Sequence, residues 1–136
     1  MRAQGPWKIV VLDDQAMMVE VIGAVLESLF DGATIVKFTD ALECLKELKR
    51  KDPELLTLDW EMPGLTGGQV LGFLSQRGAK YPILLISGAG VEMKEEVAKY
   101  KASGLKISLV EKPFTRGELL SAVAAHFGEL VRSMAA

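Results

Sequence analysis

Five side chains of this protein have the chemistry of a catalytic or binding site, and all of them stand at or just beyond the end of a short apolar run. They are the carboxylates of Asp13, Asp14 and Asp59, the hydroxyl of Ser87 and the ammonium group of Lys112. Taken one at a time, each has an ordinary structural explanation, because Asp and Ser are frequent turn or capping residues and Lys is usually exposed. Their shared position after apolar runs, such as LLTL before Asp59, favours one common site.

If these side chains meet, their types predict a specific chemistry. Three carboxylates placed together repel one another unless a cation lies among them. Oxygen ligands suit a hard divalent ion, and we expect Mg²⁺, which takes a few carboxylates together with waters and stays open to phosphate. A lysine and a hydroxyl beside such an ion would hold phosphoryl oxygens. The set therefore predicts a phosphoryl-transfer site.

The elements that must position these residues can be predicted from hydrophobic periodicity. Short apolar runs rich in branched residues predict strands, and the continuous run that begins at Trp7 predicts a buried one. They cover residues 7–12, 33–38, 54–58, 82–86 and 105–110. Amphipathic segments beginning near residues 15, 40, 67, 91 and 115 predict helices. This alternation predicts an α/β fold with a parallel sheet between layers of helices, in which ligands bind at the carboxyl ends of the strands.

Two of the expected helix starts carry the pattern of a capping box, in which a side chain at the start and a Glu three positions later each accept a backbone N–H. The pairs are Asp40 with Glu43, and Thr115 with Glu118. We therefore expect side-chain capping at both helix starts.

The bulk composition limits the class of protein. The chain has 136 residues, 49% hydrophobic and 25% charged, which predicts one globular domain over residues 1–136 with a core over about 7–131. The 16 basic and 18 acidic residues give a net charge of −2, so no direct nucleic-acid binding is expected. Cys44 is the only cysteine, which excludes an internal disulfide.

The chain also lacks the sequence signals of targeting and membrane insertion. The N-terminus, MRAQGPWK, has no apolar core of a signal peptide, and no apolar run approaches the roughly 20 residues of a membrane span. We therefore expect a soluble, cytoplasmic protein. The sequence begins at Met1 and ends beyond the last expected helix, which favours a complete protein without an attached output domain.

Taken in their order along the chain, the predicted site residues and the motifs around them resemble the receiver domain of two-component response regulators. The resemblance rests on the acidic pair at 13–14, on Asp59 with MPGLTGG at 62–68, on Ser87-Gly88 and on KPF at 112–114, and it covers nearly the whole chain. It implies a stand-alone, CheY-like receiver. The implied fold is a doubly wound, flavodoxin-like three-layer α/β/α structure, whose five-stranded parallel sheet has the order 2-1-3-4-5.

The resemblance also implies roles at the acidic site. Asp59 would accept a phosphoryl group from a phosphohistidine on a histidine kinase or histidine phosphotransfer protein. Mg²⁺ would be held by Asp14, by Asp59 and by the backbone carbonyl of Glu61, with Asp13 acting through a water molecule. The side chain of Glu61 would hang over the site and influence hydrolysis.

The remaining implied roles concern the response to phosphorylation. Lys112 would pair with the phosphoryl oxygens, aimed inward by a cis bond to Pro113, and Ser87 would hydrogen-bond the phosphoryl group. This would shift the helix near residue 91 and change the surface around it and the fifth strand, for binding an unknown downstream protein or a second copy. Leu109 departs from the family, which commonly has an aromatic three residues before the lysine.

Two alternatives from other functional classes stay open. One is an aspartyl-phosphate phosphatase of the haloacid dehalogenase type, an enzyme that also uses an Asp nucleophile, a lysine and a hydroxyl. Its DxDx[TV] motif is absent from VLDDQ, and this chain leaves no room for a cap domain. The other is an interaction module that works without phosphorylation, against which the complete set of acids, hydroxyl and lysine argues.

Overall fold

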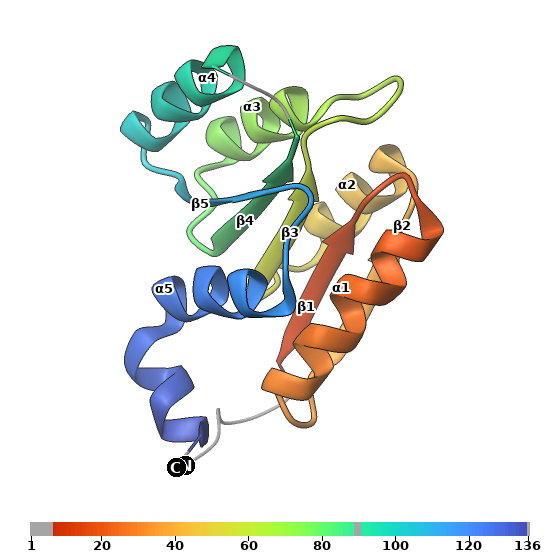
Figure 1. The fold of residues 1–136 in the computed structure, drawn as a ribbon. Helices are drawn as coiled ribbons and strands as arrows, with labels where there is room; N and C mark the ends of the chain where they lie inside the picture. The colour runs from red at the N-terminus through yellow and green to blue at the C-terminus, as the bar shows by residue number, and fades with distance from the viewer. Residues whose placement is uncertain (1–6, 89–90, 136) are drawn as a thin grey trace.

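The computed structural model describes the backbone of residues 7–88 and 91–135 and the side chains of 7–88 and 93–126. Five strands form one sheet (Figure 1). They are β1 (Lys8–Leu12), β2 (Thr34–Phe38), β3 (Leu55–Asp59), β4 (Pro82–Ser87) and β5 (Lys106–Glu111). All neighbouring strands are parallel and their order is β2-β1-β3-β4-β5, which confirms the expected topology.

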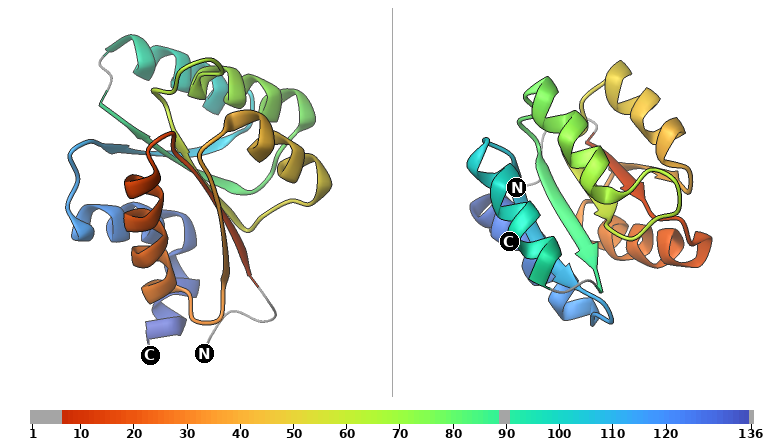
Figure 2. Two further views of the ribbon diagram at one scale, coloured as in Figure 1. Left: turned by 90° about the vertical axis from the view of Figure 1, so that its right-hand side faces the viewer. Right: turned by 90° about the horizontal axis from the view of Figure 1, so that it is seen from above.

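Five helices connect the strands and cover both faces of the sheet. They are α1 (Ala16–Leu29), α2 (Ala41–Arg50), α3 (Gly67–Arg77), α4 (Val91–Ala102) and α5 (Arg116–Ala135). Helices α1 and α5 lie on one face, and α2, α3 and α4 lie on the other (Figure 2, left). The predicted doubly wound α/β fold is therefore confirmed.

Strand alternation divides the core into two layers, because successive side chains of a strand point to opposite faces. In β1, Ile9 and Val11 pack with residues of α1 and α5, whereas Val10 and Leu12 pack with residues of α2, α3 and α4. All four are at most 1% exposed. Burial on both faces explains why the central strands are continuous apolar runs. Side chains from residue 127 onward, included in the expected core, lie outside the described part.

The helix starts test the capping predictions. Thr115 Oγ1 accepts the Glu118 N–H at 3.0 Å and Glu118 Oε1 accepts the Thr115 N–H at 3.0 Å, which confirms that capping box. The prediction for Asp40 is wrong in part: it is the N-cap residue of α2, but its side chain makes no capping hydrogen bond. Its backbone carbonyl accepts the Cys44 N–H at 3.1 Å, so the helix begins there without the carboxylate.

The capping box at the start of α3 was not predicted. The Gln69 N–H donates to Thr66 Oγ1 at 3.2 Å, and the Thr66 N–H donates to Gln69 Oε1 at 2.8 Å. The signal, Thr followed three positions later by Gln, is present in the sequence. None of the helices in the described residues is long and apolar enough to span a membrane.

Candidate functional site

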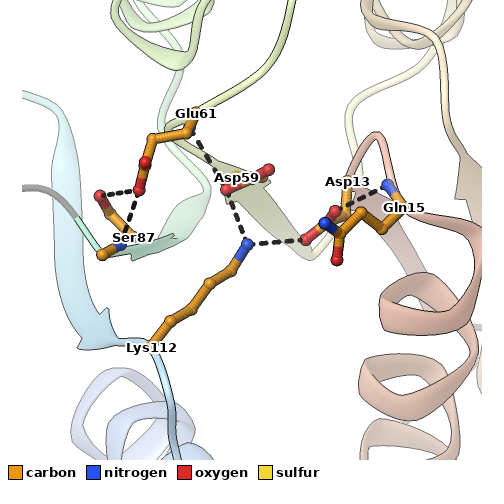
Figure 3. Close-up of polar contacts among 7 residues, drawn as sticks. Asp13, Gln15, Asp59, Glu61, Ser87 and Lys112 are labelled. Atoms are coloured by element: carbon orange, nitrogen blue, oxygen red, sulfur yellow. Dashed lines mark hydrogen bonds and ion pairs between the residues drawn. The ribbon is translucent and has the colours of Figure 1, made fainter.

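The carboxyl ends of four strands bring the predicted site residues together. Asp13 directly follows β1, Asp59 is the last residue of β3, Ser87 is the last residue of β4, and Lys112 directly follows β5. The parallel ladders extend one residue beyond the strands, because the Asp13 N–H donates to the Phe38 carbonyl at 3.2 Å and the Lys112 N–H to the Ser87 carbonyl at 2.9 Å. Backbone pairing therefore positions the site (Figure 3).

Lys112 links two buried carboxylates across the site (Figure 3). Its Nζ donates to Asp59 Oδ1 at 3.1 Å and to Asp13 Oδ2 at 3.4 Å. Both carboxylates are only 1% exposed, whereas the lysine side chain is 23% exposed. The peptide bond between Lys112 and Pro113 is cis, as the resemblance implied. The lysine thus balances part of the negative charge that the two acids place in the interior.

The acidic side chains form a group that fits a divalent cation. Asp13, Asp14 and Asp59 each offer a carboxylate oxygen, and these oxygens lie within 4.8 Å of one another. Asp59 Oδ2 is buried and has no hydrogen-bond partner among the described residues. A buried carboxylate oxygen is costly unless something binds it. Asp14 is exposed, so the cluster opens to solvent on its side. A hard cation with oxygen ligands suits this donor set.

Burial shifts the protonation equilibria of the site. Desolvation raises the pKa of Asp59 to about 6, with the hydrogen bond from Lys112 opposing this shift and the charge of Asp13 adding to it. Desolvation likewise raises the pKa of Asp13, although the N–H of Gln15 donates to its Oδ1 at 2.9 Å. Burial lowers the pKa of Lys112, but its bonds to Asp59 and Asp13 outweigh this and raise it. Lys112 therefore stays protonated at neutral pH, and Asp59 titrates closer to neutral pH than an ordinary aspartate does.

Glu61 makes a set of contacts at this site that the sequence did not predict. Its Oε1 accepts the Gly88 N–H at 2.8 Å and the Ser87 Oγ–H at 3.4 Å. Its own N–H donates to Asp59 Oδ1 at 3.3 Å. Figure 3 shows the Glu61 carboxylate reaching from the end of β3 to the end of β4. The sequence pointed to Glu61 through its position two residues after Asp59, but it did not predict the hydrogen bonds of the Glu61 side chain.

The structure thus brings together the carboxylates of Asp13, Asp14 and Asp59, with Lys112 bonded to two of them and Ser87 linked to Glu61. Leu109, at the position that commonly carries an aromatic in the family, is 38% exposed on β5. It lines a surface pocket between α4, β5 and α5 rather than the acidic cluster.

Comparison with known proteins places this site in a family. A model of the response regulator receiver domain matches residues 9–124. The chain is 32% identical over 143 residues to protein-glutamate methylesterase/protein-glutamine glutaminase 5 of Myxococcus xanthus, covering 98% of this chain and 40% of that protein. It is 32% identical over 117 residues to response regulator protein TodT of Pseudomonas putida, covering 86% of this chain and 49% of that protein. The chain thus spans about half the length, or less, of these relatives.

Solved structures show the same fold. Chemotaxis protein CheY4 of Vibrio cholerae superposes with a TM-score of 0.73 at 24% identity, covering 90% of this chain and 99% of that one. The Francisella response regulator 1452 receiver domain superposes with a TM-score of 0.74 at 23% identity, covering 92% of this chain and 98% of that one. With the family match and the acidic site at the strand ends, the chain belongs to the response regulator receiver domains, whose role is that of a phosphoacceptor in signalling.

Proposed function

We propose that Asp59 is the phosphoacceptor and that the donor is a phosphohistidine on a histidine kinase or histidine phosphotransfer protein. A carboxylate oxygen of Asp59 attacks the phosphorus atom. A new P–O bond forms, the P–N bond breaks, and its electron pair returns to the imidazole nitrogen of the donor. The product is an acyl phosphate on Asp59, which water later hydrolyses.

The observation that carries this proposal is the state of the Asp59 carboxylate. It is 1% exposed, its Oδ1 accepts a hydrogen bond from Lys112, and its Oδ2 has no hydrogen-bond partner among the described residues. The Lys112 ammonium group thus holds Oδ1, and Oδ2 is left to react. Lys112 would stay within reach of the phosphoryl oxygens after transfer, and Ser87 and the Gly88 N–H would bind them from the end of β4.

Asp13, Asp14 and Asp59, with the backbone carbonyl of Glu61, are proposed to hold Mg²⁺. The three carboxylates support this assignment, because their oxygens lie within 4.8 Å of one another. The Glu61 carbonyl and the water-mediated role of Asp13 stay predictions from the family. When bound, Mg²⁺ supplies positive charge that offsets the negative charge of the transferring phosphoryl group.

The chain acts as a signalling phosphoacceptor rather than as an enzyme on a separate substrate in this proposal. Residues 1–136 form one receiver domain, which responds through the surface around α4 and β5. That surface includes a pocket lined in part by Lys94, Leu109 and Glu118. The downstream protein, a homodimer and the cytoplasmic location stay predictions.

Intact-mass measurement with acetyl phosphate tests the acceptor. The wild type with Mg²⁺ should gain the mass of one phosphoryl group, and Asp59→Asn should gain none. Asp52→Asn is the matched control, since Asp52 is exposed and lies just before the start of β3, away from the site. Phosphorylation of Asp59→Asn at the wild-type level would refute the assignment. Turnover of a phosphate ester would instead favour the phosphatase alternative.

A further inference from the structure

The Glu61 side chain occupies donors that a phosphoryl group on Asp59 would need. One oxygen atom, Oε1, receives both the Gly88 N–H at 2.8 Å and the Ser87 hydroxyl at 3.4 Å. A Cβ placed on Gly88 would come within 3.3 Å of this same oxygen, so the absence of a side chain there gives the carboxylate its room. Ser87 is the last residue of β4 and Gly88 follows it, so both donors stand at the end of the strand that pairs with β3, which ends at Asp59.

The backbone of Glu61 explains how its side chain reaches this place. The Glu61 N–H donates to Asp59 Oδ1 at 3.3 Å, which ties the start of the loop to the acceptor itself. From there the side chain crosses from the end of β3 to the end of β4. A carboxylate oxygen and a phosphoryl oxygen are both anionic acceptors, and they compete for the same N–H and O–H groups. Two anions held at one pair of donors also repel each other.

We propose that the Glu61 carboxylate is the resting-state ligand of Ser87 and Gly88, and that phosphorylation of Asp59 displaces it. This inference rests on the proposed function, since it takes the phosphoryl group as the competing ligand. When Glu61 is displaced, the loop after β3 loses its hydrogen bonds to Ser87 and Gly88, which precede α4 in the chain. Glu61 therefore acts as an internal latch between these loops.

The surface beside Glu61 offers the displaced side chain a place. A pocket of about 520 Å³ lies next to it, lined by Trp60, Glu61, Met62, Pro63, Thr66 and Glu96. The carboxylate can turn into this open, partly polar space without disturbing the core, because Glu61 is itself exposed. Glu96 lies on α4 and lines the same pocket, so release of Glu61 changes the surroundings of that helix.

Titration with beryllium fluoride in the presence of Mg²⁺, followed by the amide NMR signals of the full chain, tests the latch. Glu61→Ala should shift the Gly88 amide signal before any addition and lower the titration midpoint by roughly tenfold, the factor that about 1.4 kcal/mol of lost competition represents. Glu61→Asp keeps the charge but is one methylene shorter, so it should behave like Glu61→Ala. Glu61→Gln keeps an oxygen that can accept the Gly88 N–H and should stay closer to wild type.

Glu96→Gln is the matched control, because it removes a carboxylate that lines the same pocket, whereas the Ser87 hydroxyl and the Gly88 N–H donate to Glu61. It should leave the midpoint unchanged. A wild-type midpoint in Glu61→Asp would overturn the latch, as would an unshifted Gly88 signal in Glu61→Ala. Normal acetyl phosphate labelling with either result would leave the proposed function standing. A wild type that takes up neither reagent would overturn both.

Discussion

At the scale of single residues, the site holds buried charge that does not serve folding. Asp13 and Asp59 are both 1% exposed and share Lys112 as a partner. Burying a carboxylate is unfavourable, and the raised pKa values of both acids show that one lysine does not fully offset it. The residues proposed to bind phosphate and cation therefore lower the stability of the unliganded protein.

The stability of Asp59→Asn measures this cost. The folded protein raises the pKa of Asp59 from 3.8 to about 6, so it binds the proton more tightly than the unfolded chain does. The contribution of Asp59 to stability thus falls as pH rises from about 4 to about 6. In EDTA at pH 7, Asp59→Asn should be more stable than wild type by about 1–3 kcal/mol in urea unfolding.

The pH and metal dependence of that difference separate electrostatics from packing. The advantage of the variant should shrink as pH falls toward 4, because Asp59 becomes protonated in the folded wild type. Added Mg²⁺ should reduce the advantage at pH 7, since a bound cation stabilises the folded wild type. A variant less stable than wild type in EDTA at pH 7 would contradict the proposed electrostatic cost.

At the scale of elements, the first residue of α3, Gly67, packs against the backbone of Asp59 and Trp60 at the end of β3. A Cβ on Gly67 would lie 2.6 Å from Trp60 Cα and 2.8 Å from the Asp59 carbonyl oxygen. The Gly67 N–H also donates to the Trp60 carbonyl at 3.0 Å. The first turn of α3 thus packs directly on the backbone that presents Asp59.

Gly67→Ala should push this backbone away from α3. Overpacking of this kind costs about 1–3 kcal/mol, measurable as a loss of unfolding free energy in urea. Phosphorylation by acetyl phosphate should slow, because Asp59 moves relative to Lys112. Gly117→Ala is the control on α5: its Cβ would lie 3.8 Å from Thr115 Oγ1, an ordinary van der Waals contact, so the substitution should be tolerated. Wild-type stability in Gly67→Ala would refute the packing argument.

A second element-scale feature joins α2 to β1 at the end of the sheet away from the site. Glu47 on α2 pairs with the buried Lys8 of β1 and with Arg50, whose guanidinium group lies 2.6 Å from Glu47 Oε2. The hydrogen bonds from Arg50 and then Lys8 lower the pKa of Glu47 from 4.5 to about 2. Folding therefore favours the ionised carboxylate.

The pH dependence of Glu47→Gln follows from this lowered pKa. A depressed carboxylate pKa stabilises the folded state above pH 4.5, and that stabilisation is lost as pH falls toward about 2. Glu47→Gln should therefore lower the melting temperature at pH 7, and its difference from wild type should narrow below about pH 4.5. Glu43→Gln, which removes an exposed pair with Lys46, should change the melting temperature little. A difference that stays constant down to pH 3 would contradict this account.

At the scale of the whole molecule, the helices differ in how firmly they hold the sheet. Helix α1 buries Val19, Ile22, Val25 and Leu26, whereas Met93 and Val97 are the α4 side chains in the core among those described. Fewer buried apolar contacts mean a lower free energy of local opening. Helix α4 begins at Val91, three residues after Gly88, so a helix with fewer buried side chains than α1 among the described residues lies close in sequence to Ser87 and Gly88, which are proposed to bind the phosphoryl group.

Hydrogen exchange should report this difference. In the unphosphorylated protein, protected amides of α4 should exchange at least about tenfold faster than those of α1, which corresponds to about 1.4 kcal/mol of opening free energy. Acetyl phosphate with Mg²⁺ should change exchange in α4 more than in α1, and Asp59→Asn should abolish the change. Equal protection of α1 and α4 would show that α4 is not the mobile element.

Much of the fold could be predicted because it depends on local patterns. Runs such as PILLI mark strands, and the spacing of Thr115 and Glu118 predicts a cap that forms. The Asp40 cap failed because the pattern permits a side-chain bond but does not require one once the backbone carbonyl starts the helix. The strand order came from the family resemblance, since periodicity does not determine which strands are neighbours.

The sequence alone determined which chemical groups stand at the strand ends, because each apolar run stops beside its polar residue. Only the tertiary structure decided their partners: Lys112 reaches Asp13 across 99 positions and Asp59 across 53, and Ser87 reaches Glu61 across 26. It also decided that Asp13 is buried while Asp14 is exposed, and that the pKa of Asp59 rises. Such contacts and desolvation depend on distances through space, which packing sets and which local periodicity does not contain.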